Sequence, residues 1–520
     1  MGFERFQSIC AECGRPVPAE YIRYEDAVYL VKNCLEHGES RVLASEDADD
    51  FERWIAYPSL TVPPRVFITE GAIADASLFD TECPLHCGPC KNHLMTACCV
   101  LLNVTDRCNQ RCPYCFAEAE QAAGADPPLA DIGRWLDRLI ELGEERKFNI
   151  QLSGGEPTVR DDLTEIVGMC KAKGFEYVQL NTNGRKLAED PAYARELKSA
   201  GLSTVFLQFD GVSDEVYMTL RGEPLLAVKK AAIKNCGAAG LPVTLVPTVL
   251  KNVNLMQTGA IIDFMLENIT FVKGVHFQPA SFFGRRPDER NKDGDFDERV
   301  TMFAVMNEIE KQTNGRIRKA DLAPISTGHP LCCFCAAYMK EGGSELRPLS
   351  SGGSCCGPED EGASSLQTQQ NACCTSPDCN PKLDPLEIIR RDRDFVLNKW
   401  DVCEPETTPC CEPENASCCV AADDLEDDPS VEKAQNEAND ANGIESESKQ
   451  SCDTSGERTA LSFDEALAMF KNNMFTVSGM AFMDETNLDA ERLRRCRVQV
   501  FSPDERLIPF CAYYSIYNNQ

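Results

Sequence analysis

Short runs of β-forming residues alternate with helical patterns from Val100 to Pro279. This alternation predicts repeated β–α units around a parallel sheet. The expected strands are Val100–Val104, Phe148–Leu152, Tyr177–Asn181, Thr204–Phe209, Val243–Val249 and Gly274–Pro279. Helices fit between them, for example at Asp162–Lys173, Tyr193–Ala200, Leu225–Ala239 and Gln257–Asn268. Six such units predict a partial (β/α)6 barrel rather than a closed eight-stranded one.

The motifs with chemical character all follow the C-terminal end of an expected strand. Active sites of α/β barrels are built on that face. The motifs are a cysteine loop after Val104, Gly154-Gly155-Glu156-Pro157, Asn181-Thr182-Asn183-Gly184 and Gln208-Phe209-Asp210-Gly211. The sequence therefore predicts a single site at this rim.

Cys108, Cys112 and Cys115 have the spacing C-x3-C-x2-C. Ordinary four-iron clusters are closed by four cysteine thiolates. Three thiolates leave one iron open, as catalytic metal sites keep an open position for a substrate or cofactor. Read alone, the same spacing also suits a structural zinc knuckle.

The segment Asp106-Arg-Cys108-Asn-Gln-Arg-Cys112-Pro-Tyr-Cys115-Phe, followed by Ser153-Gly-Gly-Glu-Pro, resembles the radical S-adenosylmethionine (radical SAM) enzymes. The resemblance implies the same partial barrel, with SAM chelating the open iron. It implies that Gly154, Gly155 and Glu156 hold the methionine part of SAM. Thr182 and Asn183 are candidates for its ribose or carboxylate.

Gln208 and Asp210 are expected to face the same opening and to bind SAM or substrate, although each also suits a capped turn. Which side chains act as catalytic groups is left open by the sequence. The chemistry implied by the resemblance is a 5'-deoxyadenosyl radical that abstracts hydrogen from an unactivated carbon.

Further segments resemble the radical SAM group that includes archaeal tetraether lipid synthases and pterin-methylating enzymes. They are Cys83-Pro-Leu-His-Cys87-Gly-Pro-Cys90, Leu207-Gln-Phe-Asp-Gly-Val, Arg492-Leu-Arg-Arg-Cys496 and Leu507-Ile-Pro-Phe-Cys511. The resemblance covers about residues 5–340 and 460–515. Arg497 departs from it, because members often have a second cysteine there.

This resemblance favours carbon–carbon bond formation on a lipid-like substrate. The first alternative is methylation of a small molecule such as a pterin, and the second is a non-catalytic iron–sulfur or soft-metal-binding protein. An apolar tunnel would favour the lipid, and a compact polar pocket would favour the small molecule. A one-electron donor such as ferredoxin or flavodoxin is the expected partner.

Two further cysteine sets are candidates for auxiliary [4Fe-4S] clusters. Cys83, Cys87 and Cys90 repeat the C-x3-C-x2-C spacing, and Cys98 is near enough in sequence to complete four ligands. A zinc site made from the same residues is the alternative. The second set, Cys332, Cys335, Cys496 and Cys511, joins two distant parts of the chain, so one or two auxiliary clusters are expected.

A mononuclear site is expected near the N-terminus. Cys10-x2-Cys13 and Cys34-x2-His37 are two knuckles joined by a β segment. This form is typical of a zinc ribbon or a rubredoxin-like site, with three cysteines and one histidine around zinc or iron.

The composition limits the setting of the protein. A formal net charge of −31 argues against nucleic acid as a partner. No signal peptide and no membrane-spanning run is recognised, so we expect a cytoplasmic protein with at most peripheral membrane contact. In the cytosol, cysteines at ligand spacing indicate metal or cluster sites rather than disulfides.

The expected organisation has five parts. The ribbon-like region is expected at residues 1–80, an auxiliary cluster segment at 81–99 and the radical SAM barrel at 100–320. A C-terminal cluster region is expected to combine residues 321–341 and 461–520. The segment between them, residues 342–460, is expected to be a disordered acidic insert. The insert lacks the apolar surface needed to repay its ordering entropy, apart from a candidate helix at 385–398. Its cysteine pairs, such as Cys355-Cys356, suit soft metal binding or low-complexity sequence.

Overall fold

The computed structural model describes residues 5–59, 61, 63–64, 85, 87, 92–119, 124–143, 148–286, 296, 298–325, 328–341, 345–349 and 472–517. All of them belong to one compact unit, Met1–Asp401 with Ala468–Gln520.

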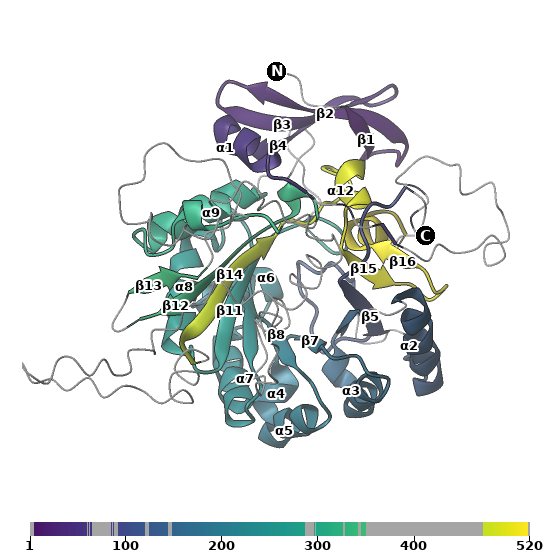
Figure 1. The fold of residues 1–520 in the computed structure, drawn as a ribbon, viewed down its shortest axis with the longest axis vertical. Helices are drawn as coiled ribbons and strands as arrows, with labels where there is room; N and C mark the ends of the chain where they lie inside the picture. The colour runs from purple at the N-terminus through teal and green to yellow at the C-terminus, as the bar shows by residue number, and fades with distance from the viewer. Residues whose placement is uncertain are drawn as a thin grey trace, which may run out of the picture. The chain divides into compact units, whose positions relative to one another are not determined.

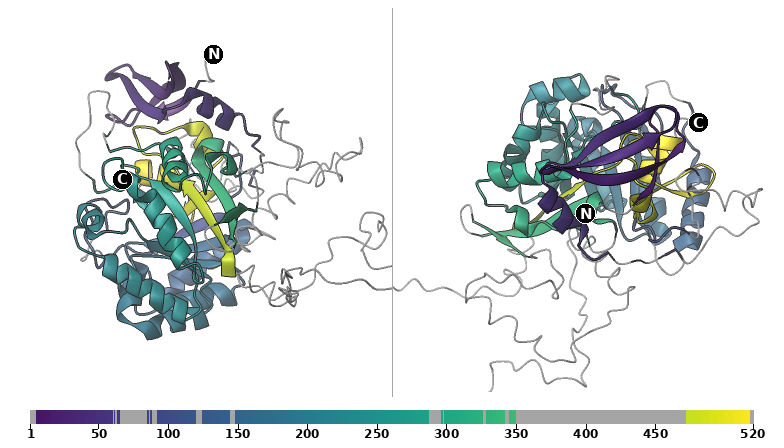
Figure 2. Two further views of the ribbon diagram at one scale, coloured as in Figure 1. Left: turned by 90° about the vertical axis from the view of Figure 1, so that its left-hand side faces the viewer. Right: turned by 90° about the horizontal axis from the view of Figure 1, so that it is seen from above.

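The N-terminal part is a four-stranded antiparallel sheet followed by a helix (Figures 1 and 2). Its elements are β1 (Phe6–Ile9), β2 (Pro16–Tyr24), β3 (Ala27–Cys34), β4 (Gly38–Ser45) and α1 (Ala48–Ile55). The Asp47 carboxylate accepts a hydrogen bond from Asp50 N at 2.9 Å and caps the start of α1. Phe51 and Trp54 then bury their rings in the main hydrophobic core.

The second sheet carries the barrel and is centred on six parallel strands. In spatial order these are β11 (Val272–Pro279), β9 (Val243–Val246), β8 (Thr204–Gln208), β7 (Val178–Thr182), β6 (Asn149–Gly154) and β5 (Cys99–Thr105). β14 (Met474–Met480) adds in parallel beside β11, and β15 (Val498–Phe501) adds in parallel beside β5. β12 (Cys333–Lys340), β13 (Leu346–Pro348) and β16 (Leu507–Pro509) extend the edges antiparallel, and the two-residue β10 (Thr248–Val249) pairs with β11.

Helices alternate with the strands and lie along one face of this sheet (Figure 1). They are α2 (Leu129–Gly143), α3 (Leu163–Ala172), α4 (Arg185–Glu189), α5 (Pro191–Ser199), α6 (Asp214–Arg221), α7 (Leu226–Ala238), α8 (Thr258–Glu267) and α9 (Met302–Gln312); the short α12 (Ala490–Arg494) and α13 (Phe510–Ala512) follow near the C-terminus. Among the described helices, none is long and apolar enough to cross a membrane.

Successive side chains along a strand point alternately into the hydrophobic core and into the cavity. In β6, Ile150 and Leu152 are fully buried in the core cluster, whereas Gln151 and Ser153 line a cavity on the opposite face. Because successive side chains point to opposite faces of a strand, one short run supplies both surfaces. Polar residues therefore reach the interior without entering the helix-facing core.

The predicted α/β partial barrel is confirmed. The structure adds that β12, β14 and β15, from the two C-terminal segments, join the barrel's own sheet. Leu346–Pro348, at the start of the segment predicted to be disordered, instead form β13. The rest of that segment, with the candidate helix at 385–398, lies outside the described residues.

A connecting loop between β14 and α12, residues 481–489, links the two sheets. On the N-terminal side, Ser8 Oγ donates to Leu488 O at 2.6 Å and Tyr21 Oη donates to Asp489 at 2.9 Å. Toward the barrel, the Asp484 carboxylate accepts from Phe282 N at 2.8 Å and pairs with Arg299 at 2.9 Å. This loop, hereafter the hub loop, depends on buried polar contacts in both directions.

We expect Asp484→Ala to destabilise the protein by about 3–5 kcal/mol, because it leaves the buried Arg299 guanidinium without its carboxylate. The side chains of this pair are 0% and 7% exposed. The measurement is urea unfolding of the metal-loaded protein followed by circular dichroism.

The control is Asp131→Ala, which breaks the exposed Asp131–Arg134 pair on α2. It should change the free energy of unfolding by no more than about 1 kcal/mol. Equal losses in the two variants would contradict a structural role for the hub loop.

Candidate functional site

A cavity of about 220 Å³ lies at the C-terminal ends of the parallel strands. It brings together most of the residues that the sequence predicts for one site. Its lining includes Cys108, Cys112, Cys115, Gly154, Gly155, Glu156, Thr182, Asn183 and Gln208. Residues from four consecutive β–α units therefore meet at one rim.

The loop with the three cysteines is fixed by backbone pairing and by two arginines. Cys115 and Arg285 exchange both N–H···O=C bonds at 2.9 Å. Arg285 Nη1 also donates to Cys112 O at 3.2 Å, and Arg221 Nη1 donates to Tyr114 O at 3.0 Å. Sequence reasoning missed both arginines, because each lies far along the chain from the loop that it holds.

Asp210 has a different place from the one expected. Its side chain is fully buried, does not line the cavity and accepts two hydrogen bonds from Arg221 at 2.7 and 2.8 Å. Burial lowers the pKa of Arg221, but the adjacent Asp210 carboxylate outweighs it and raises the pKa overall. Arg221 therefore stays protonated next to the cysteine loop, with its charge balanced by Asp210.

Lys229 of α7 is a second buried cation below the cavity. Its Nζ donates to Asn183 O at 2.6 Å and to Gln208 Oε1 at 3.2 Å. Desolvation lowers its pKa to about 8. Lys229 orients Asn183 and Gln208, and the apolar spacing of α7 gave no signal for this role.

Glycine is required at positions 154 and 155 because backbone carbonyls of the cysteine loop approach closely there. A Cβ on Gly154 would lie 2.1 Å from Thr105 O, and one on Gly155 would lie 2.2 Å from Arg107 O. Gly154 also has φ +118°, which L side chains rarely adopt. Gly155 N and Glu156 N donate to these same two carbonyls at 2.8 and 2.9 Å, which ties the glycine turn to the cysteine loop.

The Glu156 carboxylate organises the neighbouring strand end. Oε1 accepts from the Thr158 amide and hydroxyl and from Thr182 Oγ1, at 2.6–3.1 Å. Oε2 accepts from Asn183 N at 2.6 Å. Each carboxylate oxygen has about two acceptor positions, so Oε2, which accepts one hydrogen bond from Asn183 N, retains capacity for one more donor from the cavity.

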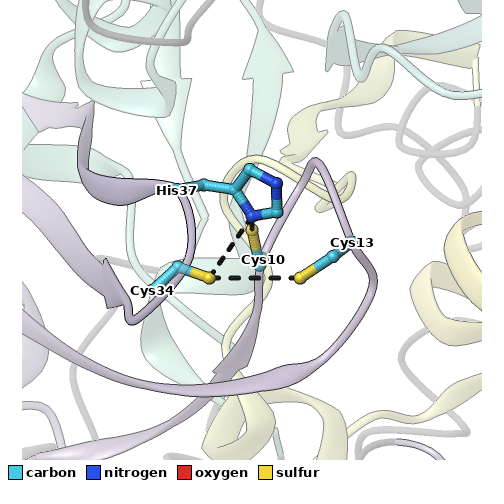
Figure 3. Close-up of side chains that lie close together, drawn as sticks. All are labelled: Cys10, Cys13, Cys34 and His37. Atoms are coloured by element: carbon cyan, nitrogen blue, oxygen red, sulfur yellow. Dashed lines mark hydrogen bonds between the residues drawn. The ribbon is translucent and has the colours of Figure 1, made fainter.

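Four ligand atoms converge in the N-terminal sheet (Figure 3). Those of Cys10, Cys13, Cys34 and His37 all lie within 4.8 Å of one another. Cys13 and Cys34 sulfurs are 4.0 Å apart, and His37 Nδ1 is 3.5 Å from Cys34 Sγ and 3.6 Å from Cys10 Sγ. A tetrahedral zinc site with bonds of about 2.3 Å has sulfurs about 3.8 Å apart, so this set fits a mononuclear ion.

Two protein families match separate parts of the chain, one in each of its two sheets. Residues 3–46 match the HMPTM N-terminal zinc ribbon domain, and residues 102–265 match the radical SAM superfamily. A 7,8-dihydro-6-hydroxymethylpterin dimethyltransferase from Methanocaldococcus jannaschii is 30% identical over 519 residues, which cover 99% of this chain and 94% of that one. The chain belongs to the radical SAM superfamily.

Other relatives match a shorter region. A GTP 3',8-cyclase from Synechococcus elongatus is 31% identical over 169 residues, 32% of this chain and 50% of that enzyme. Among solved structures, SuiB of Streptococcus suis bound to precursor peptide SuiA is 16% identical, with a TM-score of 0.35, over 44% of this chain and 47% of that one.

As a radical SAM enzyme, the protein uses a [4Fe-4S] cluster and SAM, and the cavity fits both groups. Three thiols share one wall, and the glycine turn leaves room that a Cβ would fill. Desolvation raises the pKa of Cys108 to about 12 and also raises that of Cys112. These buried thiols are therefore protonated without iron, and cluster assembly must displace their protons.

Two of the C-terminal cysteines lie at the hub loop. Ala481 N donates to Cys332 O at 2.9 Å and Met483 N donates to Cys511 Sγ at 3.2 Å, so both cysteines contact the hub loop. Desolvation raises the pKa of Cys511 to about 12. Cys335 lies on β12, opposite Ser478 of β14.

Cys83 and Cys90 of the other auxiliary set lie outside the described residues. Cys87 packs with Phe510 and Cys511 in one hydrophobic cluster, and Cys98 N donates to Arg497 O at 3.0 Å. The described members of both auxiliary sets therefore lie along the same C-terminal segment. Both sets, Cys83/Cys87/Cys90/Cys98 and Cys332/Cys335/Cys496/Cys511, are proposed as cluster ligands.

Gly154→Ala should reduce SAM cleavage at least ten-fold, because strained backbone at such a site costs about 1–3 kcal/mol. The measurements are 5'-deoxyadenosine formation and the SAM-induced change in the EPR spectrum of the reduced cluster. Gly168→Ala in α3, where an added Cβ meets nothing within 4 Å, is the matched control. Wild-type behaviour of Gly154→Ala would contradict the close approach.

The ribbon metal should be lost in acid. Hydrogen bonds from the Glu36 backbone and from His37 lower the pKa of Cys34 to about 6. The Cys34 thiolate is present above that pH and is lost as the pH falls through it. Because Cys13 has a raised pKa, zinc already competes with protons at higher pH, and Cys34 should add roughly a further ten-fold loss of zinc affinity per pH unit below about 6. Chelator competition with a zinc-sensitive dye measures this dependence.

Cys34→Ser should remove the ribbon metal, whereas Cys236→Ala, in the core of α7, should keep it. Full zinc retention by Cys34→Ser would rule out the four-ligand site.

Proposed function

We propose that this protein is a radical SAM C-methyltransferase whose substrate is a pterin or a closely similar heterocycle. The observation that carries the proposal is a row of carboxamides facing the cavity. Gln151, Asn181, Gln208 and Gln278 come from four strands of the barrel, and all line the cavity. The similarity to a pterin dimethyltransferase along nearly the whole chain supports it independently.

Two of the carboxamides are joined by hydrogen bonds. Gln151 Nε2 donates to Asn181 Oδ1 at 2.6 Å, and Asn181 Nδ2 donates to Ser153 Oγ at 3.4 Å. Amides offer donors and acceptors side by side, which is how Asn and Gln pair with the edge of a purine base. A pterin presents the same kind of alternating edge.

Aromatic rings border the same cavity. Phe206, Phe283, Phe482 and Phe510 are among its lining residues. Flat heterocycles stack on such rings. Donor–acceptor amides combined with phenyl faces therefore match a flat, polar-edged molecule.

The lipid hypothesis has less support from these carboxamides. An alkyl chain would offer no hydrogen bonds to the amides that line the cavity, whereas the edge of a heterocycle offers donors and acceptors to them. The cavity lining combines amide groups with a larger apolar part, so the proposal of a small heterocycle depends on the amides beside phenyl rings and on the similarity to the pterin dimethyltransferase.

The chain's own residues bind and orient the reactants. Gly154, Gly155 and Glu156 are proposed to hold the methionine part of SAM, and Lys229 positions Asn183 and Gln208 beside it. When bound and reduced, the cluster supplies the electron that cleaves SAM to methionine and the 5'-deoxyadenosyl radical. A ferredoxin or flavodoxin is the proposed electron donor.

The test is anaerobic turnover of the reconstituted protein with SAM, dithionite and 7,8-dihydro-6-hydroxymethylpterin. We expect 5'-deoxyadenosine and a methylated pterin by mass spectrometry, and neither with Cys112→Ala. Cys170→Ala, in the core of α3, should retain both products.

A lipid extract is assayed in parallel. Coupled lipid products without any pterin product would contradict the proposal. A pterin product formed equally well by Cys112→Ala would contradict the radical mechanism.

A further inference from the structure

Three consecutive polar residues between Cys108 and Cys112 have different environments. Asn109 Oδ1 accepts from Asn183 Nδ2 at 2.7 Å, so this side chain faces the next strand end. Arg111 is exposed to solvent. Gln110 alone turns inward: it is 3% exposed and lines the cavity.

Gln110 contacts two of the three cysteine sulfurs. Its backbone N–H donates to Cys108 Sγ at 3.4 Å. Its side-chain Oε1 lies 3.7 Å from Cys112 Sγ, in the position of an acceptor from the thiol S–H. Its Nε2 is buried and has no hydrogen-bond partner among the described residues.

This arrangement suits a thiol but not a cluster ligand. A cysteine that ligates iron is a thiolate and has no proton to donate, so Oε1 would then face a negative sulfur. The two ends of a glutamine amide are nearly equal in shape. Rotating the amide by half a turn would place an N–H toward Cys112 and give the unpaired Nε2 a partner.

We propose that Gln110 is a positioning residue that donates an N–H···S hydrogen bond from its side chain to Cys112 when the cluster is bound, and so raises the reduction potential of the cluster. This inference rests on the proposed assignment of Cys108, Cys112 and Cys115 as ligands. Hydrogen bonds to cluster sulfurs are one of the factors that set such potentials. A donor stabilises the reduced, more negative state more strongly than the oxidised one.

The first test is an EPR-monitored redox titration of the reconstituted protein without SAM. Gln110→Leu should bind a full complement of iron but have a more negative midpoint potential than wild type. We expect the ratio of reduced to oxidised cluster, at a fixed solution potential, to fall about ten-fold, which is about 59 mV for a one-electron couple. Gln110→Glu should shift it in the same direction, because a carboxylate offers no donor.

The control is Arg111→Lys, which keeps the charge of an exposed residue in the same loop and should leave the potential unchanged. An unchanged potential in Gln110→Leu at full iron content would overturn the proposal. Because the potential is independent of turnover, a more negative potential in Gln110→Leu together with no pterin methylation by the wild type would count against the proposed function instead.

The second test does not depend on a variant that assembles the cluster. Wild-type protein labelled with ¹⁵N at glutamine side chains should show a nitrogen coupling to the reduced cluster in pulsed EPR, and Arg111→Lys should show the same coupling. Absence of that coupling in wild type, or its persistence in Gln110→Glu, would overturn the hydrogen bond.

Discussion

The ion pair between Arg221 and Asp210 is the interaction on which the site depends most. A buried guanidinium is costly unless it is paired and hydrogen-bonded, and the Asp210 carboxylate meets that need with two bonds. Arg221 can then direct its remaining donor to Tyr114 O, within the cysteine loop. The position of the loop thus depends on charges supplied by the turn after β8 and by α6, about a hundred residues away.

The same arrangement balances charge in a water-poor cavity. Thiolates and a carboxylate would repel one another in a region of low dielectric constant. Arg221 and Lys229 lie beneath them, and the charges of both interact with Cys112. The cations therefore offset part of the desolvation that raises the pKa of Cys112 and keeps this thiol protonated without iron.

Sequence reasoning succeeded where the signal is local. The β–α alternation located all six barrel strands, because periodicity reflects which face of each element is buried. Cysteine spacing predicted the ribbon set, and the structure brings the ligand atoms of Cys10, Cys13, Cys34 and His37 together, since these residues lie on two short turns joined by a hairpin. Sequence reasoning wrongly placed Asp210 at the opening, because a turn residue after a strand can point either into the cavity or back beneath it.

What sequence could not show depends on contacts between distant segments. Arg285 and Lys229 hold the site through partners more than 20 residues away, and neither stands in a motif. The hub loop likewise joins Tyr21 to Asp489 across 468 positions. Such pairs are fixed by the tertiary fold, which a single sequence does not encode as a pattern.

The pairing of β15 with β5 has a consequence for the order in which the protein matures. Domains fold as the chain is synthesised from its N-terminus, yet β5, which leads into the cysteine loop, gains its outer neighbour only when residues 498–501 are made. Val498 and Phe510 also close the cavity wall. Until then β5 lacks its outer neighbour, so we expect the cluster to be inserted stably only after the whole chain has been synthesised.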